Sequence, residues 1–290
     1  MSQSAQARPV DIGPVIQPTQ PARAAFHRLE GSPVRKYFLY APKHATPSSP
    51  IVVLVHGISR NAAEHLFRFM PEADRSGAVL VAPLFLRETY GQYQQVIDPT
   101  RRTRADLALL DIIDDVARRT GTKTHRIHLF GFSGGAQFAH RFAMMHPQRV
   151  ASAVCCAAGW YTFPDPDQPY PLGIETHPVA GDSFDVAAFS RVPMHVVVGS
   201  RDVARDKSVR VSDALDDQQG STRLERARRW FGSLETAAAR TGTADPGRSI
   251  SIIPQVGHSF TEAAGRRGLT GIVFEKFGLT PTALLRKSKP

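Results

Sequence analysis

The sequence predicts an α/β fold in which a mostly parallel central sheet is flanked by helices on both faces. Short apolar runs alternate along the chain with longer amphipathic stretches, the order typical of strands joined by covering helices. Most of these runs are near-continuous in Val, Ile, Leu or Ala, as in strands buried on both sides. The 290 residues, 42% hydrophobic and 21% charged, suffice for one large domain with a sizeable core.

Seven apolar runs are predicted to be strands of this sheet. They are bounded by Gly, Pro or polar clusters, and their lengths fit those of ordinary buried strands. The predicted strands are residues 34–40, 51–56, 78–82, 126–130, 150–156, 194–198 and 249–253.

Three amphipathic helices are predicted between the strands. In residues 106–120, apolar side chains recur every three to four positions, and Gly121 follows as a C-terminal stop. A second helix is predicted over residues 136–145, directly after a glycine-rich turn. The third begins at the capping-box pattern Thr222-x-x-Glu225, and we expect it to cover the sheet near its end.

The remaining segments define the predicted domain organisation. Residues 1–24 are rich in Gln, Pro and Ala and are predicted to be a disordered N-terminal segment, with residues 25–290 forming a single domain. Residues 83–105 and 159–191 are too long for simple connections, which favours functional loops. The second of these follows the strand at 150–156, and we expect it to form a short lid-like insertion.

Composition limits the partners and the compartment. The net charge is +10, but Lys and Arg are scattered or interleaved with acidic residues, which does not favour a nucleic-acid partner. No apolar run approaches the ~20 residues of a membrane span, so no membrane insertion is expected. Cys155 and Cys156 are adjacent in an apolar run and are interpreted as buried free thiols. With no signal-peptide pattern in residues 1–24, a cytoplasmic location is expected, while the oligomeric state is not indicated.

The run Gly131-Phe132-Ser133-Gly134-Gly135 matches the pattern Gly-x-Ser-x-Gly. A predicted strand precedes it and a predicted helix follows it, which is the context of a nucleophile elbow. Glycine is required on both flanks because a Cβ there would collide with the neighbouring strand or helix. Ser133 is therefore the candidate nucleophile.

A serine hydroxyl needs a base to take its proton and an acid to orient that base. Asp202 follows the strand at 194–198, and His258 follows the strand at 249–253, so both lie in the chain order that a Ser, acid, His triad requires. Asp206 remains the competing acid, although it lies further from the strand end.

The same chemistry needs backbone donors for a tetrahedral oxyanion. The candidates are the amide of Gly134, just after the nucleophile, and that of Ile58, in the loop after the strand at 51–56. Ser59 is the alternative second donor. His56, at the end of that strand, is interpreted as part of the oxyanion loop rather than as a base.

With these motifs, the chain resembles the α/β-hydrolase superfamily, and within it the polyhydroxybutyrate-depolymerase and feruloyl-esterase group. The resemblance covers about residues 34–278 and implies an ester substrate and no cofactor. Secreted polymer depolymerases usually carry a signal peptide, disulfides and a surface-binding domain, none of which is visible in the sequence, so a small-molecule ester is expected instead. The motifs are residues 55–57, 131–135, 199–202 and 257–258, with 35–42 and 137–142 similar to the named group.

The expected activity is cleavage of a carboxylic ester through an acyl-enzyme intermediate. Trp160 and Tyr161, in the lid-like segment, and Tyr93 are candidates for the substrate pocket. No His-Glu-x-x-His or His-x-x-Glu-His pattern occurs, so no metal site is expected. A peptidase or amidase on the same triad, a catalytically silent ligand-binding protein and an acidic partner for the basic chain remain alternatives.

Overall fold

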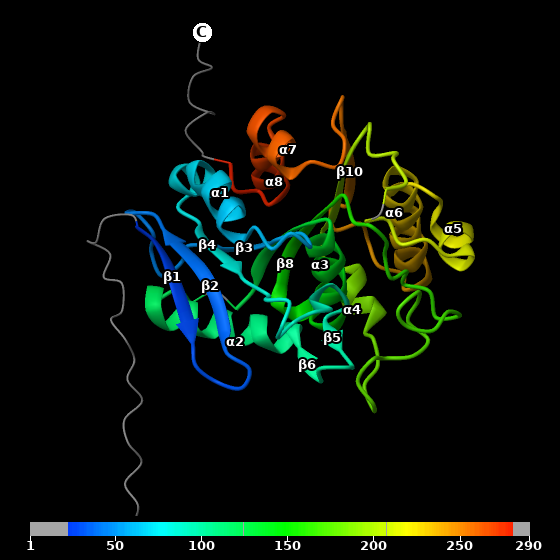
Figure 1. Ribbon diagram of the computed structural model, residues 1–290, viewed down its shortest axis with the longest axis horizontal. Helices are drawn as coiled ribbons and strands as arrows, with labels where there is room; N and C mark the ends of the chain where they lie inside the picture. The colour runs from blue at the N-terminus through cyan, green and yellow to red at the C-terminus, as the bar shows by residue number, and fades with distance from the viewer. Residues whose placement is uncertain (1–22, 124, 207, 281–290) are drawn as a thin grey trace, which may run out of the picture.

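An eight-stranded sheet forms the centre of the molecule in a computed structural model that describes residues 23–123, 125–206 and 208–280 (Figure 1). The strand order is β1-β2-β4-β3-β7-β8-β9-β10. The first two strands are antiparallel to each other and β2 is antiparallel to β4, whereas the pairings from β4 to β10 are parallel. The strands are β1 (Arg23–Leu29), β2 (Arg35–Ala41), β3 (Ile51–Val55), β4 (Val79–Pro83), β7 (Ile127–Phe132), β8 (Val150–Cys156), β9 (Met194–Gly199) and β10 (Ser249–Ile253).

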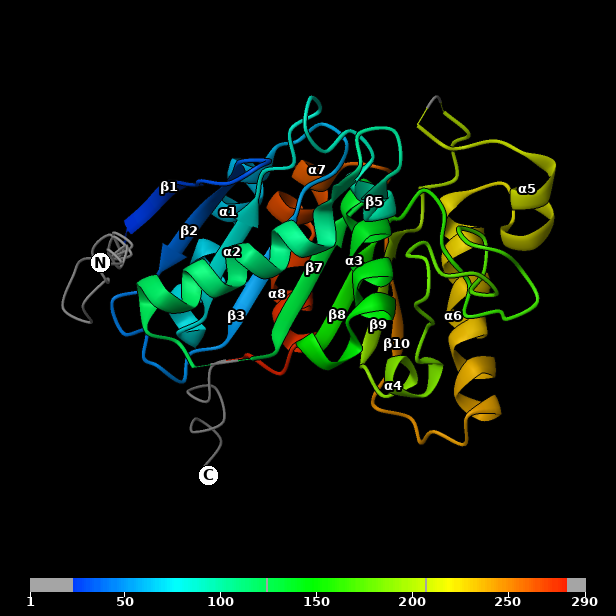
Figure 2. The same cartoon turned by 90° about the horizontal axis from the view of Figure 1, so that it is seen from below.

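Helices cover both faces of the sheet, which confirms the predicted fold class (Figure 2). One core contains side chains of α2, α3 and α6, and the other contains side chains of α1, α7 and α8. Along β3, Val53 belongs to the first core and Leu54 to the second, because successive side chains of a strand point to opposite faces. The helices are α1 (Ala62–Ser76), α2 (Ala105–Thr120), α3 (Gly134–Met145), α4 (Val186–Ser190), α5 (Asp213–Gln219), α6 (Arg223–Arg240), α7 (Phe260–Arg266) and α8 (Leu269–Lys276).

Helix ends are set by the predicted signals. Gly121 ends α2 in the left-handed conformation, with φ of 71°, and its amide donates to Ala117. Thr222 and Glu225 form a complete capping box at the start of α6, and this helix packs on β9 and β10 at the end of the sheet. Both features were expected from the sequence.

Several elements lie where the sequence predicts none, among them β1 and the helices α1, α5, α7 and α8. Helix α1 contains Pro71, which breaks the helical pattern in the sequence, yet Leu66, Phe69 and Ala73 are buried at helical spacing. Strand β1 begins at Arg23, so two residues of the predicted N-terminal segment belong to the sheet. The rest of that segment, residues 1–22, lies outside the described residues.

The two long irregular segments contain only short elements. Residues 83–105 include a 3-10 turn at Tyr93–Gln95 and the two-residue strands β5 (Ile97–Asp98) and β6 (Thr103–Arg104). Within residues 159–191 the only helix is α4. The first part of this insertion is buried, since Tyr161 stacks on Trp230 of α6 with ring centroids 4.5 Å apart.

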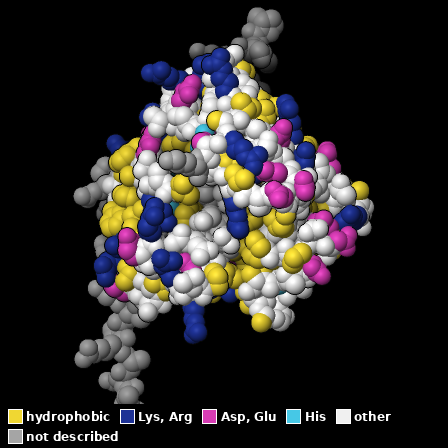
Figure 3. Space-filling model, turned by 45° about the vertical axis from the view of Figure 1, so that its right-hand side comes forward, with side chains coloured by type: hydrophobic (Ala, Val, Ile, Leu, Met, Phe, Trp, Pro, Cys, Tyr) yellow, Lys and Arg dark blue, Asp and Glu magenta, His cyan; other side chains and the backbone are white. Residues whose placement is uncertain are grey.

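Cys155 and Cys156 are buried free cysteines, as predicted, and burial raises the pKa of both thiols. Within the described residues, no helix has the length and apolarity needed to traverse a bilayer. On the face shown in Figure 3, Lys and Arg side chains occur in separate places among acidic and hydrophobic ones. This distribution matches the scattered charge of the sequence.

Candidate active site

Ser133 lies on the sharp turn between β7 and α3. Its φ of 55° and ψ of −114° are unusual for a residue with a Cβ, and its amide donates to the Cys156 carbonyl at 2.8 Å. A Cβ at Gly131 would lie 2.1 Å from the Gly135 oxygen, and one at Gly135 would lie 2.1 Å from the Val55 oxygen. Both flanks of the turn therefore require glycine, for the steric reason expected from the sequence.

A chain of hydrogen bonds joins Asp202, His258 and Ser133. His258 Nε2 lies 3.0 Å from Ser133 Oγ, and His258 Nδ1 lies 2.8 Å from Asp202 Oδ2. Asp202 follows β9 and His258 follows β10, and in a parallel sheet these strand ends meet at the edge that carries the β7–α3 turn. The Phe132 ring stacks against the His258 ring with centroids 5.1 Å apart.

Asp206, the competing acid, does not contact His258 in the described structure. Its carboxylate binds Arg223 instead, with Oδ1 to Nη2 at 3.2 Å and Oδ2 to Nη1 at 3.3 Å. Hydrogen bonds from Arg223 and Ser208 hold the pKa of Asp206 well below its ordinary value. The geometry therefore pairs His258 with Asp202.

The two predicted oxyanion donors lie next to each other. Gly134 is the first residue of α3, so its amide precedes the helical hydrogen-bond ladder. A Cβ at Gly134 would lie 3.4 Å from the Ile58 amide nitrogen and 2.8 Å from Tyr93 Oη. Among the described residues, no backbone carbonyl accepts from the Ile58 amide. Ser59, the alternative donor, lines the same pocket.

His56 supports the loop that carries Ile58. Burial lowers the pKa of His56 to about 3, so the ring is neutral at physiological pH. Its Nδ1 donates to the Gly57 carbonyl at 2.8 Å, and its Nε2 accepts from the Phe85 amide at 3.1 Å. Both ring nitrogens are occupied, so His56 is not placed to act as a base, and the loop after it is the one that carries Ile58.

Arg60 and Tyr93 also hold this loop, and neither role was expected from the sequence. Arg60 Nη1 donates to the Ile58 carbonyl at 2.9 Å, and its Nε donates to the Phe85 carbonyl at 2.8 Å. Tyr93 Oη donates to the His56 carbonyl at 2.8 Å. The orientation of the Ile58 peptide thus depends on contacts with the segment after β4.

A pocket of about 250 Å³ opens beside Ser133 and His258. Its wall combines apolar side chains with hydroxyl, amide and carboxylate groups. Ile58 is 50% exposed at this pocket, whereas Phe132 is buried. The wall residues that were not predicted as pocket residues are Gly57, Asn61, Glu64, His65, Phe132, Ser208, Phe260 and Thr261.

The three aromatic residues predicted for the substrate pocket do not line this one. Tyr161 and Tyr93 are buried in the core, where Tyr161 stacks on Trp230 and Tyr93 binds the His56 carbonyl. Trp160 is also buried and packs under the Arg141 guanidinium, 4.1 Å from its ring centroid. The contacts of these three rings are those of packed aromatic side chains, and a role for them toward a substrate stays a prediction.

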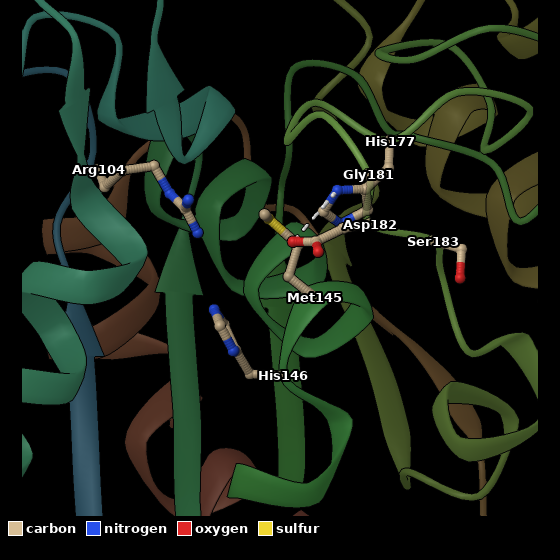
Figure 4. Close-up of a pocket in the computed structure, with 7 residues that line it drawn as sticks. All are labelled: Arg104, Met145, His146, His177, Gly181, Asp182 and Ser183. Atoms are coloured by element: carbon tan, nitrogen blue, oxygen red, sulfur yellow. Dashed lines mark ion pairs between the residues drawn. The ribbon is translucent and has the colours of Figure 1, made fainter.

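A second pocket, of about 380 Å³, lies near the C-terminal end of α3. The 12 residues of this helix span about 18 Å, so the two pockets are well separated. In Figure 4, Arg104 and His146 point toward each other, and His177 and Asp182 come from the facing segment. Arg104 and His146 both bind the buried Asp106 carboxylate, at 2.6 and 2.9 Å. These groups therefore already have an anionic partner within the protein.

The described residues contain no group of three or more His, Cys, Asp or Glu side chains that could hold a metal ion. We therefore assign no metal ligand among the residues that line the Ser133 pocket.

Comparisons with known proteins agree with this architecture. No protein-family model matches the chain. One curated protein, a bifunctional acetylxylan esterase/xylanase from Neocallimastix patriciarum, is 26% identical over 169 residues, which are 57% of this chain and 24% of that protein. The chain thus matches about a quarter of the length of that relative.

Several solved structures share the fold. Poly(aspartic acid) hydrolase-1 from Sphingomonas sp. KT-1 superposes with a TM-score of 0.76 at 23% identity, covering 88% of this chain and all of that one. A poly(3-hydroxybutyrate) depolymerase from Bordetella parapertussis gives 0.74 at 23% identity, covering 91% and 92%. A ferulic acid esterase gives 0.57 at 12% identity, covering 89% and 99%. The chain therefore has the α/β-hydrolase fold, and its structural neighbours include both enzyme types of the group that its motifs resemble.

Proposed function

We propose that the chain is a serine hydrolase that cleaves carboxylic esters through an acyl-enzyme intermediate. The observation that carries the proposal is the continuous hydrogen-bonded chain from Asp202 through His258 to Ser133, with distances of 2.8 and 3.0 Å. These distances are those of a nucleophile, its base and the group that orients the base. The esterases and hydrolases among the similar proteins support the same reaction.

In the first half of the reaction, Ser133 Oγ attacks the ester carbonyl while His258 Nε2 takes the hydroxyl proton. The carbonyl π-electrons move onto oxygen, and the amides of Ile58 and Gly134 donate to the resulting oxyanion. When the tetrahedral intermediate collapses, the C–O bond to the alcohol breaks and His258 returns the proton to the leaving oxygen. Asp202 stabilises the imidazolium that exists between these transfers.

In the second half, water replaces the alcohol beside His258. The base takes a proton from water, the hydroxide attacks the acyl-enzyme, and the same two amides bind the second oxyanion. Collapse of this intermediate breaks the bond to Ser133 Oγ, which takes the proton back from His258, and releases the acid. A pocket of about 250 Å³ at Ser133 suits a small-molecule ester as the substrate.

Amide hydrolysis on the same residues is a second candidate. It is favoured by one structural neighbour, named as a poly(aspartic acid) hydrolase, since poly(aspartic acid) is joined by amide bonds. The two activities are separated by comparing p-nitrophenyl esters with matched aryl amides. Equal turnover of both would favour the amidase.

The proposal is tested with Ser133→Ala. We expect kcat for p-nitrophenyl esters to fall by roughly a millionfold and covalent labelling by a serine-directed phosphonate to disappear. Ser59→Ala, in the same pocket, is the matched control and should keep the labelling. Esterase activity that survives in Ser133→Ala would exclude Ser133 as the nucleophile, and a wild-type chain that is neither labelled nor active would point to a silent ligand-binding protein.

A further inference from the structure

Arg223 is a fully buried arginine directly behind the proposed triad. Its Nη1 lies 3.1 Å from Asp202 Oδ1, the carboxylate oxygen that does not face His258. Its Nη2 lies 3.2 Å from Asp206 Oδ1 and also donates to the Ser208 hydroxyl. The two terminal nitrogens thus bind three residues, of which Ser208 lines the pocket beside Ser133.

The position of Arg223 at the start of a helix is unfavourable for a positive charge. It is the first residue of α6, where the positive end of the helix dipole disfavours a cation. Burial of its charge adds a desolvation cost that only close anionic partners offset. A guanidinium is therefore retained at this site by the carboxylates of Asp202 and Asp206.

Two buried titratable groups also lie near Asp202. Cys156 of β8 and Tyr161 of the insertion lie close enough to interact electrostatically with its carboxylate. Burial raises the pKa of both groups, so they are neutral at physiological pH. Within the described residues, the Asp202 carboxylate is bound by Arg223 and His258, and Asp206 is linked to it through Arg223.

We propose that Arg223 is a positioning residue for the proposed hydrolysis, holding Asp202 toward His258 and setting the charge that His258 experiences. This inference rests on the proposed function. The guanidinium fixes one carboxylate oxygen, which leaves the other directed at His258 Nδ1. Its positive charge also opposes the imidazolium, while Asp206 partly cancels that effect.

Removal of the Arg223 charge should move the pH profile of the reaction in one direction. The active form of the base is neutral His258, so the acidic limb of the pH profile of kcat/KM reports its protonation. In Arg223→Met the imidazolium loses a nearby cation and is stabilised. We expect the midpoint of the acidic limb to move up by about one pH unit.

We also expect kcat of Arg223→Met to fall roughly 10- to 100-fold, because Asp202 is less well oriented. Arg223→Lys keeps the charge and should restore the midpoint while recovering only part of kcat.

Asp206→Asn removes a negative charge instead of a positive one, at a more exposed position. The Asp206 side chain is 44% exposed, so its replacement should leave the fold intact. Loss of this anion leaves the Arg223 charge less balanced, and the midpoint should move down by a few tenths of a pH unit. Opposite shifts in the two variants distinguish an electrostatic role from a purely structural one.

The neighbouring ion pair between Arg226 of α6 and Asp216 of α5 supplies two control variants. Arg226 is also fully buried and lies one turn after Arg223, but its carboxylate partner is Asp216 at 2.8 Å. Arg226→Met and Asp216→Asn should therefore change stability without comparable shifts of the midpoint. Both controls are measured with the same p-nitrophenyl ester as the test variants.

The outcomes separate this inference from the proposed function. If wild type is active and its midpoint is unchanged in both Arg223→Met and Asp206→Asn, Arg223 has no positioning role. If Arg223→Met does not fold, the downward shift in Asp206→Asn decides, and an unmoved midpoint there overturns the inference. A wild type without serine-dependent activity would refute the proposed function itself.

Discussion

At the scale of single residues, the loop beside Ser133 is held by side chains that do not line its pocket. Tyr93 is buried below the oxyanion loop, and its hydroxyl binds the His56 carbonyl at 2.8 Å. Arg60 binds the Ile58 carbonyl on the other side of the same loop. These two bonds hold the peptides before and after the one that presents the Ile58 amide. They thereby limit its movement, and preorganised amides are what stabilise an oxyanion.

Tyr93→Phe should therefore weaken catalysis more than binding. We expect kcat for p-nitrophenyl esters to fall roughly three- to tenfold with little change in KM, less than the 10²- to 10³-fold cost of deleting an oxyanion donor. The free energy of unfolding should also fall by about 1 to 3 kcal/mol, because a buried carbonyl loses its partner. Steady-state kinetics and urea unfolding measure the two effects.

Tyr90→Phe is the control for this prediction. Tyr90 is buried in the same cluster, with its ring centroid 5.4 Å from that of Phe85, and it makes no described hydrogen bond to the oxyanion loop. A loss of kcat as large as in Tyr93→Phe would show that packing of the cluster, rather than the bond to His56, sets the position of the loop.

The sequence predicts those site residues that stand in a recognisable local motif. Ser133 is marked by its glycines, and Asp202 and His258 by their places after strands, so the sequence alone nominates the three residues that the structure brings together. Arg223 and Tyr93 carry no such local mark. Their roles arise from contacts across 21 and 37 positions of the chain, which only the folded structure reveals.

At the scale of elements, the β7–α3 junction leaves no room for added side-chain atoms at Gly131 or Gly135. Strand β3 passes so close to α3 that a Cβ at Gly135 would lie 2.1 Å from the Val55 oxygen and 2.7 Å from the His56 oxygen. Both obstacles are backbone atoms, which cannot move aside without shifting the strand. This close approach keeps the nucleophile next to the oxyanion loop.

Gly135→Ala should accordingly destabilise the protein by more than about 3 kcal/mol and abolish labelling of Ser133, as expected for severe overpacking. Gly232→Ala is the matched control, because Gly232 lies inside α6 with no atom within 4 Å of its would-be Cβ. That substitution should raise the free energy of unfolding by about 0.5 to 1 kcal/mol. Thermal unfolding and phosphonate labelling test both variants. Equal stability of the two would contradict the close approach at the junction.

The accuracy of the predicted elements depends on their surroundings. Strands β8 and β10 have the predicted bounds: an arginine precedes each run, and a proline follows β10. Strand β7 continues two residues beyond its predicted end, into the glycine-rich motif itself. Helix α1 was not predicted, since Pro71 lies in its interior and its stability comes from packing against the sheet and α8. Tertiary packing thus overrides local signals at the elements that the sequence does not reveal.

At the scale of the whole molecule, buried histidines couple folding to pH. Burial lowers the pKa of His65, His128 and His195 to about 4 and that of His56 to about 3. In the unfolded chain these rings take up protons near their ordinary pKa of 6.5. Between that pH and about 4 the unfolded state therefore binds more protons than the native state, so stability is lost as the pH falls.

Buried carboxylates act in a lower and separate window. Asp106 is bound by Arg104 and His146, and although burial opposes ionisation, these partners lower its pKa from 3.8 to about 2. Its contribution to stability is complete above its ordinary pKa and is lost only as the pH falls from about 4 to 2. Destabilisation that begins between pH 6.5 and 5 must then come from the histidines.

We therefore expect the free energy of unfolding in urea to decrease between pH 7 and pH 5. Each buried neutral histidine contributes a slope of up to about 1.4 kcal/mol per pH unit in this range, so several of them can remove most of a typical net stability of about 5 to 15 kcal/mol.

His128→Gln should make this slope shallower by one such contribution, because the ring that resists protonation next to Ser152 and Phe277 is gone. His44→Gln replaces an exposed histidine and is the matched control, which should leave the slope as in the wild type. A free energy of unfolding that is constant from pH 7 to pH 5 would mean that the buried rings are protonated in the native state, with anionic partners that the described contacts do not provide.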